Sequence, residues 1–381
     1  MPEKNTTTKK KILEIINSWD DEEIPEEERL SKADRQNIVF SYLKDDIYPG
    51  KDVRPADERR GFERSLFAII KEKNLNKLIK AGYNKETIDD IQKSIKNYNI
   101  LLDLGNIPGT EKKYSDIFPM VSEGKINPNS EFYVEMWHLP TDFETTVELT
   151  LGMASKKDEI DKKEKYQELA LGLFLDFIGN SDYLEQVKEK YNIKIKRHEK
   201  DITLKETLIQ DKNEAKEKAL KFLEAIIEKI EIVYNDYANE IESTKISEKI
   251  EYYKENLEEI VTEDIKVGYC PIDPNPSNFL VYLDKKGFLK KRQKVRRAVI
   301  DQKATSKDLI FGPLSFLKGY LIETAKKHNL PAKIVNTISK NLKEIYTNDK
   351  IAEIGKLYAD IKYTKYYRKE ANIVEKSYEE E

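Results

Sequence analysis

Three oxygen-bearing side chains in the last third of the chain have the types and spacing needed for phosphoryl transfer. Asp273 and Asn278 lie in the loop Ile272-Asp-Pro-Asn-Pro-Ser-Asn-Phe-Leu280, and Asp301 closes the run Val299-Ile-Asp. Magnesium that bridges two phosphates prefers hard oxygen ligands, which the amide of Asn278 and the carboxylate of Asp301 supply. A separate carboxylate, Asp273, can accept the proton of an attacking hydroxyl. The pattern predicts a catalytic base at Asp273 and a metal site at Asn278 and Asp301.

The same loop has a structural alternative. Asp and Asn side chains next to proline often cap their own backbone, so the segment can be read as a proline-rich surface turn. Three features that follow the loop favour the chemical interpretation: an apolar strand at Phe279–Leu283, a turn at Asp284–Gly287 and a return strand at Ala298–Ile300. A loop, hairpin and terminal Asp in this order form a motif, whereas Asp273 and Asn278 alone do not.

The loop resembles the His-Gly-Asp-x-His-Pro-x-Asn-hydrophobic-Leu catalytic loop of aminoglycoside phosphotransferases, choline kinases and related atypical kinases. Val299-Ile-Asp301 resembles their second metal-binding motif. This chain has Pro271 and Ile272 in place of the family's His and Gly, and Asn275 in place of its second His. The resemblance implies an α+β, kinase-like two-lobed fold, with a small mixed α/β N-lobe and a large, mostly helical C-lobe. It also implies ATP and Mg²⁺ as cofactors, and a nucleotide and an unknown small-molecule or protein acceptor as partners.

The resemblance further implies a strand lysine that holds the nucleotide phosphates and pairs with an acid on the following helix. Lys71 is the best-placed lysine in the sequence, because it ends an apolar strand pattern and precedes a predicted helix. Glu86, Asp89 and Asp90 are candidate partners. The alternative is a solvated surface lysine in a lysine-rich chain. No glycine-rich phosphate loop precedes this segment.

In such proteins a hinge strand hydrogen-bonds adenine through its backbone, and the strand Phe132–Trp137 falls at the corresponding place. Glu135 and Trp137 on its edge are therefore candidate cofactor-binding residues. Since backbone groups would do the binding, side-chain identity tests this assignment poorly. The alternative is an ordinary core strand, with Trp137 packed and His138 in a loop.

The segment Lys290–Arg297 has six basic residues in eight, on the return arm of the predicted hairpin. Lysine and arginine supply most of the affinity for phosphate, so nucleic acid, a phosphorylated substrate or the nucleotide are conceivable ligands. A solvent-facing hairpin balanced by acidic helices is the preferred interpretation. No aromatic residue within the run offers a stacking platform, which argues against a nucleic-acid partner.

The composition of the chain limits the classes of protein to which it can belong. The 381 residues include 67 basic and 71 acidic side chains, and the net charge of -4 creates no field that would attract polyanions or lipid. One cysteine, Cys270, excludes an intrachain disulfide, and three scattered histidines lack metal-ligand spacing. The longest apolar run, 169–178, is about half the length a bilayer helix needs. With no apolar signal core at the N-terminus, we expect a cytoplasmic protein of thermophile-like composition.

The elements that must position these residues follow from periodicity. We expect a charged N-terminal extension with one helix at 1–36, an N-lobe at 37–140, and a helical C-lobe at 141–381 that carries the catalytic-type loop and hairpin at 262–302. Strand patterns occur at Ile38–Leu43, Leu66–Ile70 and Glu131–Trp137, and a helix capped by Asn84 lies between the last two. A long amphipathic helix is predicted from Asn213 to about Glu242.

Two alternatives to an active phosphotransferase remain. The first is a kinase-like pseudoenzyme that binds nucleotide or acts as a scaffold, which the altered His-Gly and the missing glycine-rich loop favour. The second is an all-helical interaction protein with an incidental hairpin, which the strand patterns before residue 140 disfavour.

Overall fold

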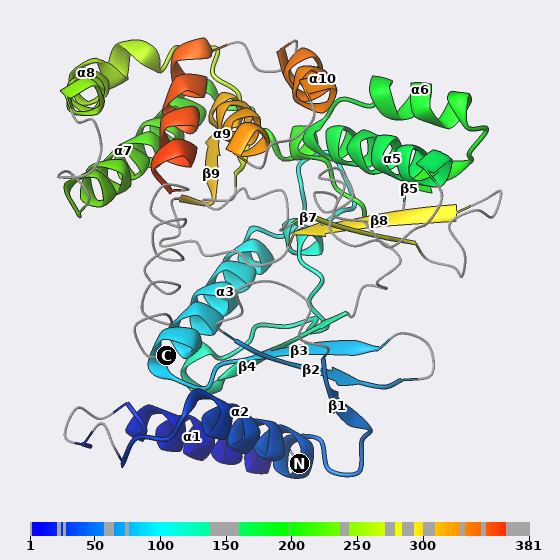
Figure 1. Ribbon diagram of the computed structural model, residues 1–381, viewed down its shortest axis with the longest axis vertical. Helices are drawn as coiled ribbons and strands as arrows, with labels where there is room; N and C mark the ends of the chain where they lie inside the picture. The colour runs from blue at the N-terminus through cyan, green and yellow to red at the C-terminus, as the bar shows by residue number, and fades with distance from the viewer. Residues whose placement is uncertain are drawn as a thin grey trace. The chain divides into compact units, whose positions relative to one another are not determined.

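Two compact units make up the chain, which we describe from a computed structural model (Figure 1). The first comprises Met1–Thr141, Glu199–Asp201 and Ala298–Thr305, and the second comprises Asp142–His198, Ile202–Arg297 and Ser306–Glu381. The structure describes residues 2–20, 24–25, 28–56, 65–72, 76–137, 160–197, 199–236, 244–270, 279–283, 293–299, 309–327, 332–343 and 348–362.

An antiparallel four-stranded sheet organises the first unit. Its strands are β1 (Val53–Pro55), β2 (Leu66–Ile70), β3 (Lys77–Ala81) and β4 (Tyr133–Trp137), and they lie side by side in that order. The apolar, β-branched run of β2 suits a strand that has a neighbour on each side. The predicted strands at Leu66–Ile70 and Glu131–Trp137 are confirmed.

Helices cover both faces of this sheet (Figure 1). On one face, α1 (Pro2–Ser18) and α2 (Lys32–Ser41), which continues into the π-helical turn η2 (Tyr42–Ile47), pack against the inward residues of the strands. On the other face lies α3 (Lys85–Leu104), whose Ile91 and Ile95 pack with Val134 and Met136 of β4. Short 3-10 turns, η3 (Tyr114–Ile117) and η4 (Pro128–Ser130), lie between α3 and β4.

The α3 helix begins where the sequence predicts. Asn84 caps it, with its side-chain Oδ1 accepting from the backbone N–H of Thr87 at 2.9 Å, and the Thr87 hydroxyl completes a capping box. The apolar positions Ile88, Ile91, Ile95 and Tyr98 are all buried, as their three- and four-residue spacing requires. The predicted helix is therefore confirmed.

The strand predicted at Ile38–Leu43 is wrong, because these residues form the end of α2 and the start of η2. Val39, Leu43 and Ile47 recur every four residues, and all three are buried against the sheet. Spacing by four is the helical period, and it outweighed the β-branched composition that suggested a strand. Ser31 caps the helix by accepting the N–H of Asp34.

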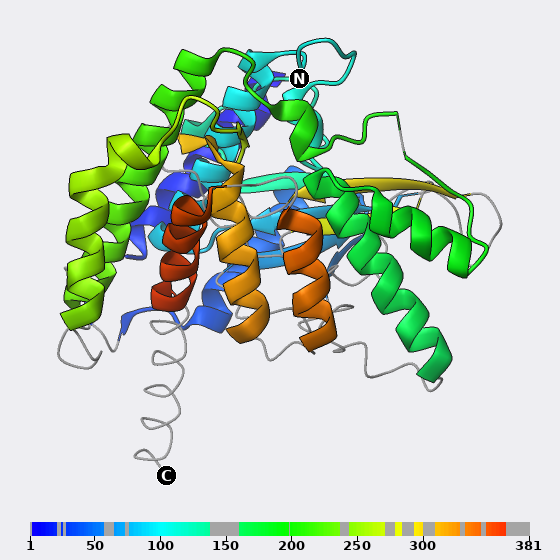
Figure 2. The ribbon, with the colours of Figure 1, turned by 90° about the horizontal axis from the view of Figure 1, so that it is seen from above.

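Most of the second unit is helical (Figure 2). Its helices are α5 (Ile160–Ile178), α6 (Asp182–Lys190), α7 (Lys212–Asp236), α8 (Thr244–Ile260), α9 (Leu314–Lys327) and α10 (Ala332–Lys343), with a further helix at 349–362 and a 3-10 turn η5 (Leu204–Thr207). The amphipathic stripe of α7 is confirmed, since Phe222, Leu223, Ile226 and Ile230 are buried. Phe222 meets Phe316 of α9 edge to face, with ring centroids 5.1 Å apart.

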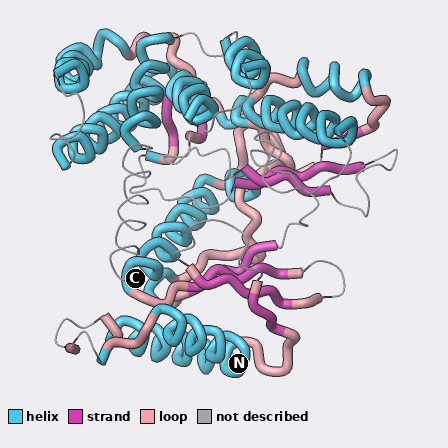
Figure 3. The backbone as a smooth tube through the Cα atoms, in the orientation of Figure 1, coloured by secondary structure: helices cyan, strands magenta, loops and turns pink. Residues whose placement is uncertain are grey.

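Two small sheets contain the remaining strands, which lie in the second unit except for the last two residues of β8 (Figure 3). One has the strand order β5 (Ile195–Arg197), β8 (Gln293–Val299) and β7 (Phe279–Leu283), and the other pairs β6 (Val267–Tyr269) with β9 (Phe311–Pro313). The predicted strands at Phe279–Leu283 and before Asp301 therefore exist and are neighbours. The α+β class, with a small mixed unit and a larger, mostly helical one, is confirmed.

No helix in the described part of the chain is both long enough and apolar enough to span a membrane.

Candidate functional site

Asp273, Asn278 and Asp301 lie outside the described residues, but the strands beside them are described. The strand β7 begins at the residue after Asn278, and β8 ends two residues before Asp301. The nine residues that separate β7 from β8 in the sequence are fewer than a parallel crossover needs, so we expect this neighbouring pair to be an antiparallel hairpin. The two predicted strands exist as neighbours, the predicted turn at 284–287 lies outside the described residues, and the roles of the three residues stay predictions.

Lys71 lies one residue beyond β2 and is exposed. Its backbone N–H donates to the carbonyl oxygen of Asp52 at 3.0 Å. In kinases the phosphate-binding lysine lies on the third strand, next to the helix that carries its acidic partner. The strand before α3 is β3, which Lys71 precedes by a turn. The assignment of Lys71 stays a prediction, and β3 offers a second candidate.

That candidate is Lys80, on a strand with a neighbour on each side. The register places Lys80 opposite Phe67 of β2 and Val134 of β4. Leu78, two residues earlier, packs with the cluster formed by Ile91, Ile95 and Val134. Alternate residues of a strand share a face, so Lys80 belongs to the face that α3 covers.

The other lysine of β3, Lys77, is engaged on the opposite face. Its ammonium lies 3.4 Å from Oε2 of Glu135 and 3.4 Å from Oε1 of Glu72. Glu135 is opposite Ile79, which is fully buried against the N-terminal helices. Lys77 is therefore on the face of the sheet toward those helices, and Lys80 is the strand lysine on the α3 side.

The three predicted acidic partners differ in their surroundings. Asp89 is exposed, and its helical angle places it away from the apolar face of α3. Glu86 and Asp90 are four residues apart and so share a side of the helix, at the edge of the buried face. Asp90 is half-buried, whereas Glu86 is exposed and lies in the first turn. Of the three, Asp90 is the acid on α3 best placed for a lysine on the covered face of the sheet.

The sequence did not single out Lys80 as a candidate because Lys77 and Lys80 interrupt the apolar pattern of β3. The sequence does contain one indication. Lys80 follows the apolar pair Leu78-Ile79 and precedes the Asn84 cap by four residues, which is the order of a strand lysine followed by a helix. The chain passes from β3 into α3 with little space, which explains the glycine at position 82. A Cβ atom there would lie 2.7 Å from the backbone nitrogen of Ile88.

The edge of β4, where Glu135 and Trp137 were predicted to bind adenine, is already hydrogen bonded. The carbonyl oxygen of Glu135 accepts from the N–H of Val121 at 3.0 Å, and the N–H of Trp137 donates to the carbonyl oxygen of Pro119 at 2.8 Å. These backbone groups point away from β3 and are the ones a nucleotide would need. The hinge assignment stays a prediction. A nucleotide could bind these backbone groups only if the segment around Met120 moved away from β4 and broke the two hydrogen bonds.

The side chain of Glu135 belongs to a partly buried polar network between α1, the residue after η2 and the sheet. The hydroxyl of Tyr48 donates to Oε1 of Glu135 at 2.7 Å, and the ammonium of Lys9 lies 2.7 Å from Oε1 of Glu131 and over the ring of Tyr133. Burial raises the pKa values of Tyr48, Tyr133 and Glu131. Burial opposes the charge of Lys9, but Tyr133 and Glu131 together raise its pKa.

Of the basic run Lys290–Arg297, the structure describes only the backbone of residues 293–297. Its second half lies in β8, which pairs in parallel with β5 through Ile195, Lys196 and Arg197. Arg197 of β5 is itself neutralised by the buried Asp176 of α5, with Nε 3.0 Å from Oδ2 and Nη2 paired to Oδ1. The prediction of a solvated basic hairpin is not tested by these contacts.

Among the described residues, no group of three or more His, Cys, Asp or Glu is arranged to hold a metal ion. The predicted ligands Asn278 and Asp301 stand outside that part of the chain. Their amide and carboxylate oxygens are the hard donors that Mg²⁺ prefers, so the chemistry of the pair fits the ion.

Comparisons with known proteins identify no family for this chain. No family model matches it, and no curated protein matches it. Seven chains of solved structures match. One is described as the crystal structure of an aminoglycoside-3'-phosphotransferase of type VIII, with 10% sequence identity and a TM-score of 0.41, covering 86% of this chain and 99% of that chain. A likeness at this level does not establish what the chain does.

Proposed function

We propose that the chain is an ATP-dependent phosphotransferase of the kinase-like class, acting on an acceptor that the sequence does not specify. The observation that carries the proposal is the position of Lys80. It lies on a strand flanked by two others, on the face covered by α3, a few residues before a helix whose half-buried edge holds Asp90. This is the arrangement in which kinases hold nucleotide phosphates.

The motif at Asp273, Asn278 and Asp301 supports the other half of the proposal. Asn278 and Asp301 would hold Mg²⁺, which neutralises phosphate charge when bound. Asp273 would accept the proton of the acceptor hydroxyl, and Lys80 would orient the phosphates. Each role matches the residue type at its position, and the neighbouring strands β7 and β8 flank these residues in the sequence.

Nucleotide affinity of two matched lysine variants tests the proposal. In Lys80→Met the dissociation constant for ATP with Mg²⁺, measured by calorimetry, should rise by about tenfold or more, because a charge-assisted phosphate contact is worth about 1.5–3 kcal/mol. Lys71→Met, an exposed lysine that ends the neighbouring strand, should bind as the parent does. Equal affinity for all three proteins would remove the observation on which the proposal rests, and a loss in Lys71→Met alone would restore the sequence-based assignment.

The second candidate is a kinase-like pseudoenzyme that binds nucleotide, or acts as a scaffold, without transferring phosphate. Pro271 and Ile272 in place of the family's His and Gly favour it. Turnover separates the two: an active enzyme hydrolyses or transfers the γ-phosphate of ATP, and Asp273→Asn abolishes that activity while nucleotide binding persists. Binding without any turnover in the parent would support the pseudoenzyme.

A further inference from the structure

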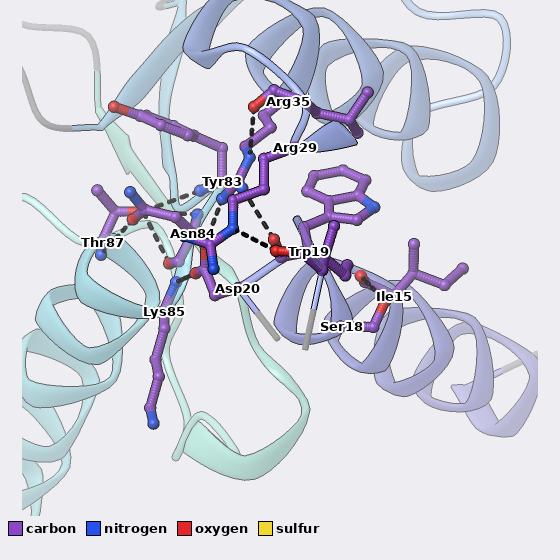
Figure 4. Close-up of polar contacts among 12 residues, drawn as sticks. Ile15, Ser18, Trp19, Asp20, Arg29, Arg35, Tyr83, Asn84, Lys85 and Thr87 are labelled. Carbon is purple, nitrogen blue, oxygen red and sulfur yellow. Dashed lines mark hydrogen bonds and ion pairs between the residues drawn. The ribbon is translucent and has the colours of Figure 1, made fainter. Parts of the chain in front are cut away.

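A buried arginine joins the N-terminal helices to one another (Figure 4). Arg35 of α2 is 8% exposed, and its guanidinium contacts three separate groups. Its Nε donates to the carbonyl oxygen of Leu30 at 3.1 Å, its Nη2 donates to the carbonyl oxygen of Trp19 at 2.8 Å, and its Nη1 pairs with Oδ1 of Asp20. A cation this buried is stable only when it is paired and hydrogen bonded, as Arg35 is.

The second oxygen of Asp20 reaches the first residue of α3. Oδ2 accepts the backbone N–H of Lys85 at 2.5 Å, across 65 positions of sequence. The first N–H groups of a helix have no partner within it, and a carboxylate there also interacts favourably with the helix dipole. Figure 4 shows Asp20 between Arg35 and the start of α3.

The contact from Asp20 is additional to the helix's own cap. Asn84 already satisfies the N–H of Thr87 through its side chain and that of Ile88 through its carbonyl oxygen, at 2.9 Å each. Asp20 therefore accepts an N–H of the first turn that the Asn84 cap does not reach, and it does so from outside the helix. Since Arg35 fixes the carboxylate, the start of α3 is tied to helices that cover the opposite face of the sheet.

We infer that Asp20 is a positioning residue for the nucleotide site, an inference that rests on the proposed function. Asp90 lies less than two helical turns from Lys85, and Lys80 precedes Lys85 by five residues. The direction of the first turns of α3 therefore sets where Asp90 lies relative to Lys80. The N-terminal segment acts on phosphate binding through this helix, without touching the nucleotide.

Nucleotide affinity and unliganded stability, measured on the same variants, test this role. Asp20→Ala should weaken the binding of ATP with Mg²⁺ by about fivefold, and Asp20→Asn, which keeps an oxygen acceptor but not the charge, should lie between it and the parent. The matched control is Asp103→Ala in the last turn of α3, which removes an exposed ion pair to Lys125 at 2.8 Å. It should leave nucleotide affinity unchanged.

A double-mutant cycle separates positioning from a general loss of stability. If Asp20 acts through Lys80, adding Asp20→Ala to Lys80→Met should cause little further loss of affinity, so the two effects are not additive. Full additivity, or a lower unfolding temperature for Asp20→Ala with unchanged affinity, would overturn the inference. If Asp20→Ala does not fold, Asp20→Asn takes its place in the cycle.

The outcome also distinguishes this inference from the proposed function. A parent protein that binds no ATP overturns both. A parent that binds ATP and requires Lys80, together with Asp20 variants of parental affinity, overturns the positioning role alone.

Discussion

The crossing of α9 and the helix at 349–362 leaves no space for a side chain at Gly319. A Cβ atom on Gly319 would lie 1.7 Å from the carbonyl oxygen of Ala352, and one on Gly355 would lie 2.2 Å from the carbonyl oxygen of Phe316. Ordinary contacts of a Cβ atom begin at 3.4 Å. In a Gly319→Ala variant the two backbones would therefore have to move apart by about 1.7 Å, the difference between 3.4 Å and 1.7 Å.

The sign of the effect is as informative as its size. In an unconstrained helix, replacing glycine by alanine stabilises by about 1 kcal/mol. Here the alanine would push apart a contact lined by Phe316, Leu317 and Tyr320, all fully buried. Overpacking costs about 1–3 kcal/mol, and we expect the upper end because the obstacle is backbone that no rotamer change can move. The predicted free energy of unfolding therefore falls by about 3 kcal/mol.

Urea unfolding followed by circular dichroism measures this change. Gly124→Ala is the control, because a Cβ atom there meets nothing within 4 Å, so its stability should stay within about 1 kcal/mol of the parent. If Gly319→Ala is as stable as the parent, or more stable, then the two helices do not approach each other this closely.

Three further changes test other parts of the structure. Asn84→Ala removes the cap of α3 and should lower the free energy of unfolding by about 1 kcal/mol in a urea titration; an unchanged value would show that the cap is dispensable. Burial raises the pKa of Glu131, so the parent should lose stability relative to Glu131→Gln as pH rises from 4.5 to 7; the opposite trend would mean that its ion pair with Lys9 outweighs burial. Burial also raises the pKa of Cys270, so a thiol reagent should label the folded protein slowly even at pH 9 and quickly only on unfolding; fast labelling of the folded protein would contradict its burial.

Local signals predicted much of the fold. The cap at Asn84 and the spacing of Ile88, Ile91 and Ile95 fixed α3, because both the cap and the buried face depend on residues within one helix. The stripe of α7 is of the same kind. The strand β2 was also predictable, since a short run of β-branched and aromatic residues with a glycine nearby is typical of a strand.

Predictions that depended on neighbours far along the chain did less well. Ile38–Leu43 has strand composition, and the helical spacing of Val39, Leu43 and Ile47 becomes decisive once the sheet buries all three. The choice between Lys71 and Lys80 depends on which strand precedes α3 and on which face each lysine lies, and both follow from strand pairing. The bond from Asp20 to Lys85 joins residues 65 positions apart and has no sequence signature.

The same limit applies to the edge of β4. From sequence its backbone groups could be free, whereas the pairing with Pro119 and Val121 occupies them. Backbone hydrogen bonds carry no side-chain signature, so strand edges are difficult to assign from sequence.

The central claim is that this chain binds a magnesium nucleotide, and thermal unfolding with ATP tests it most directly. A ligand that binds only the folded state raises stability by about 2.7 kcal/mol when its concentration is a hundred times the dissociation constant. We expect ATP to raise the unfolding temperature of the parent only with Mg²⁺ present, and Asp301→Ala to lose this dependence on Mg²⁺. An unfolding temperature that millimolar ATP and Mg²⁺ leave unchanged would contradict the claim.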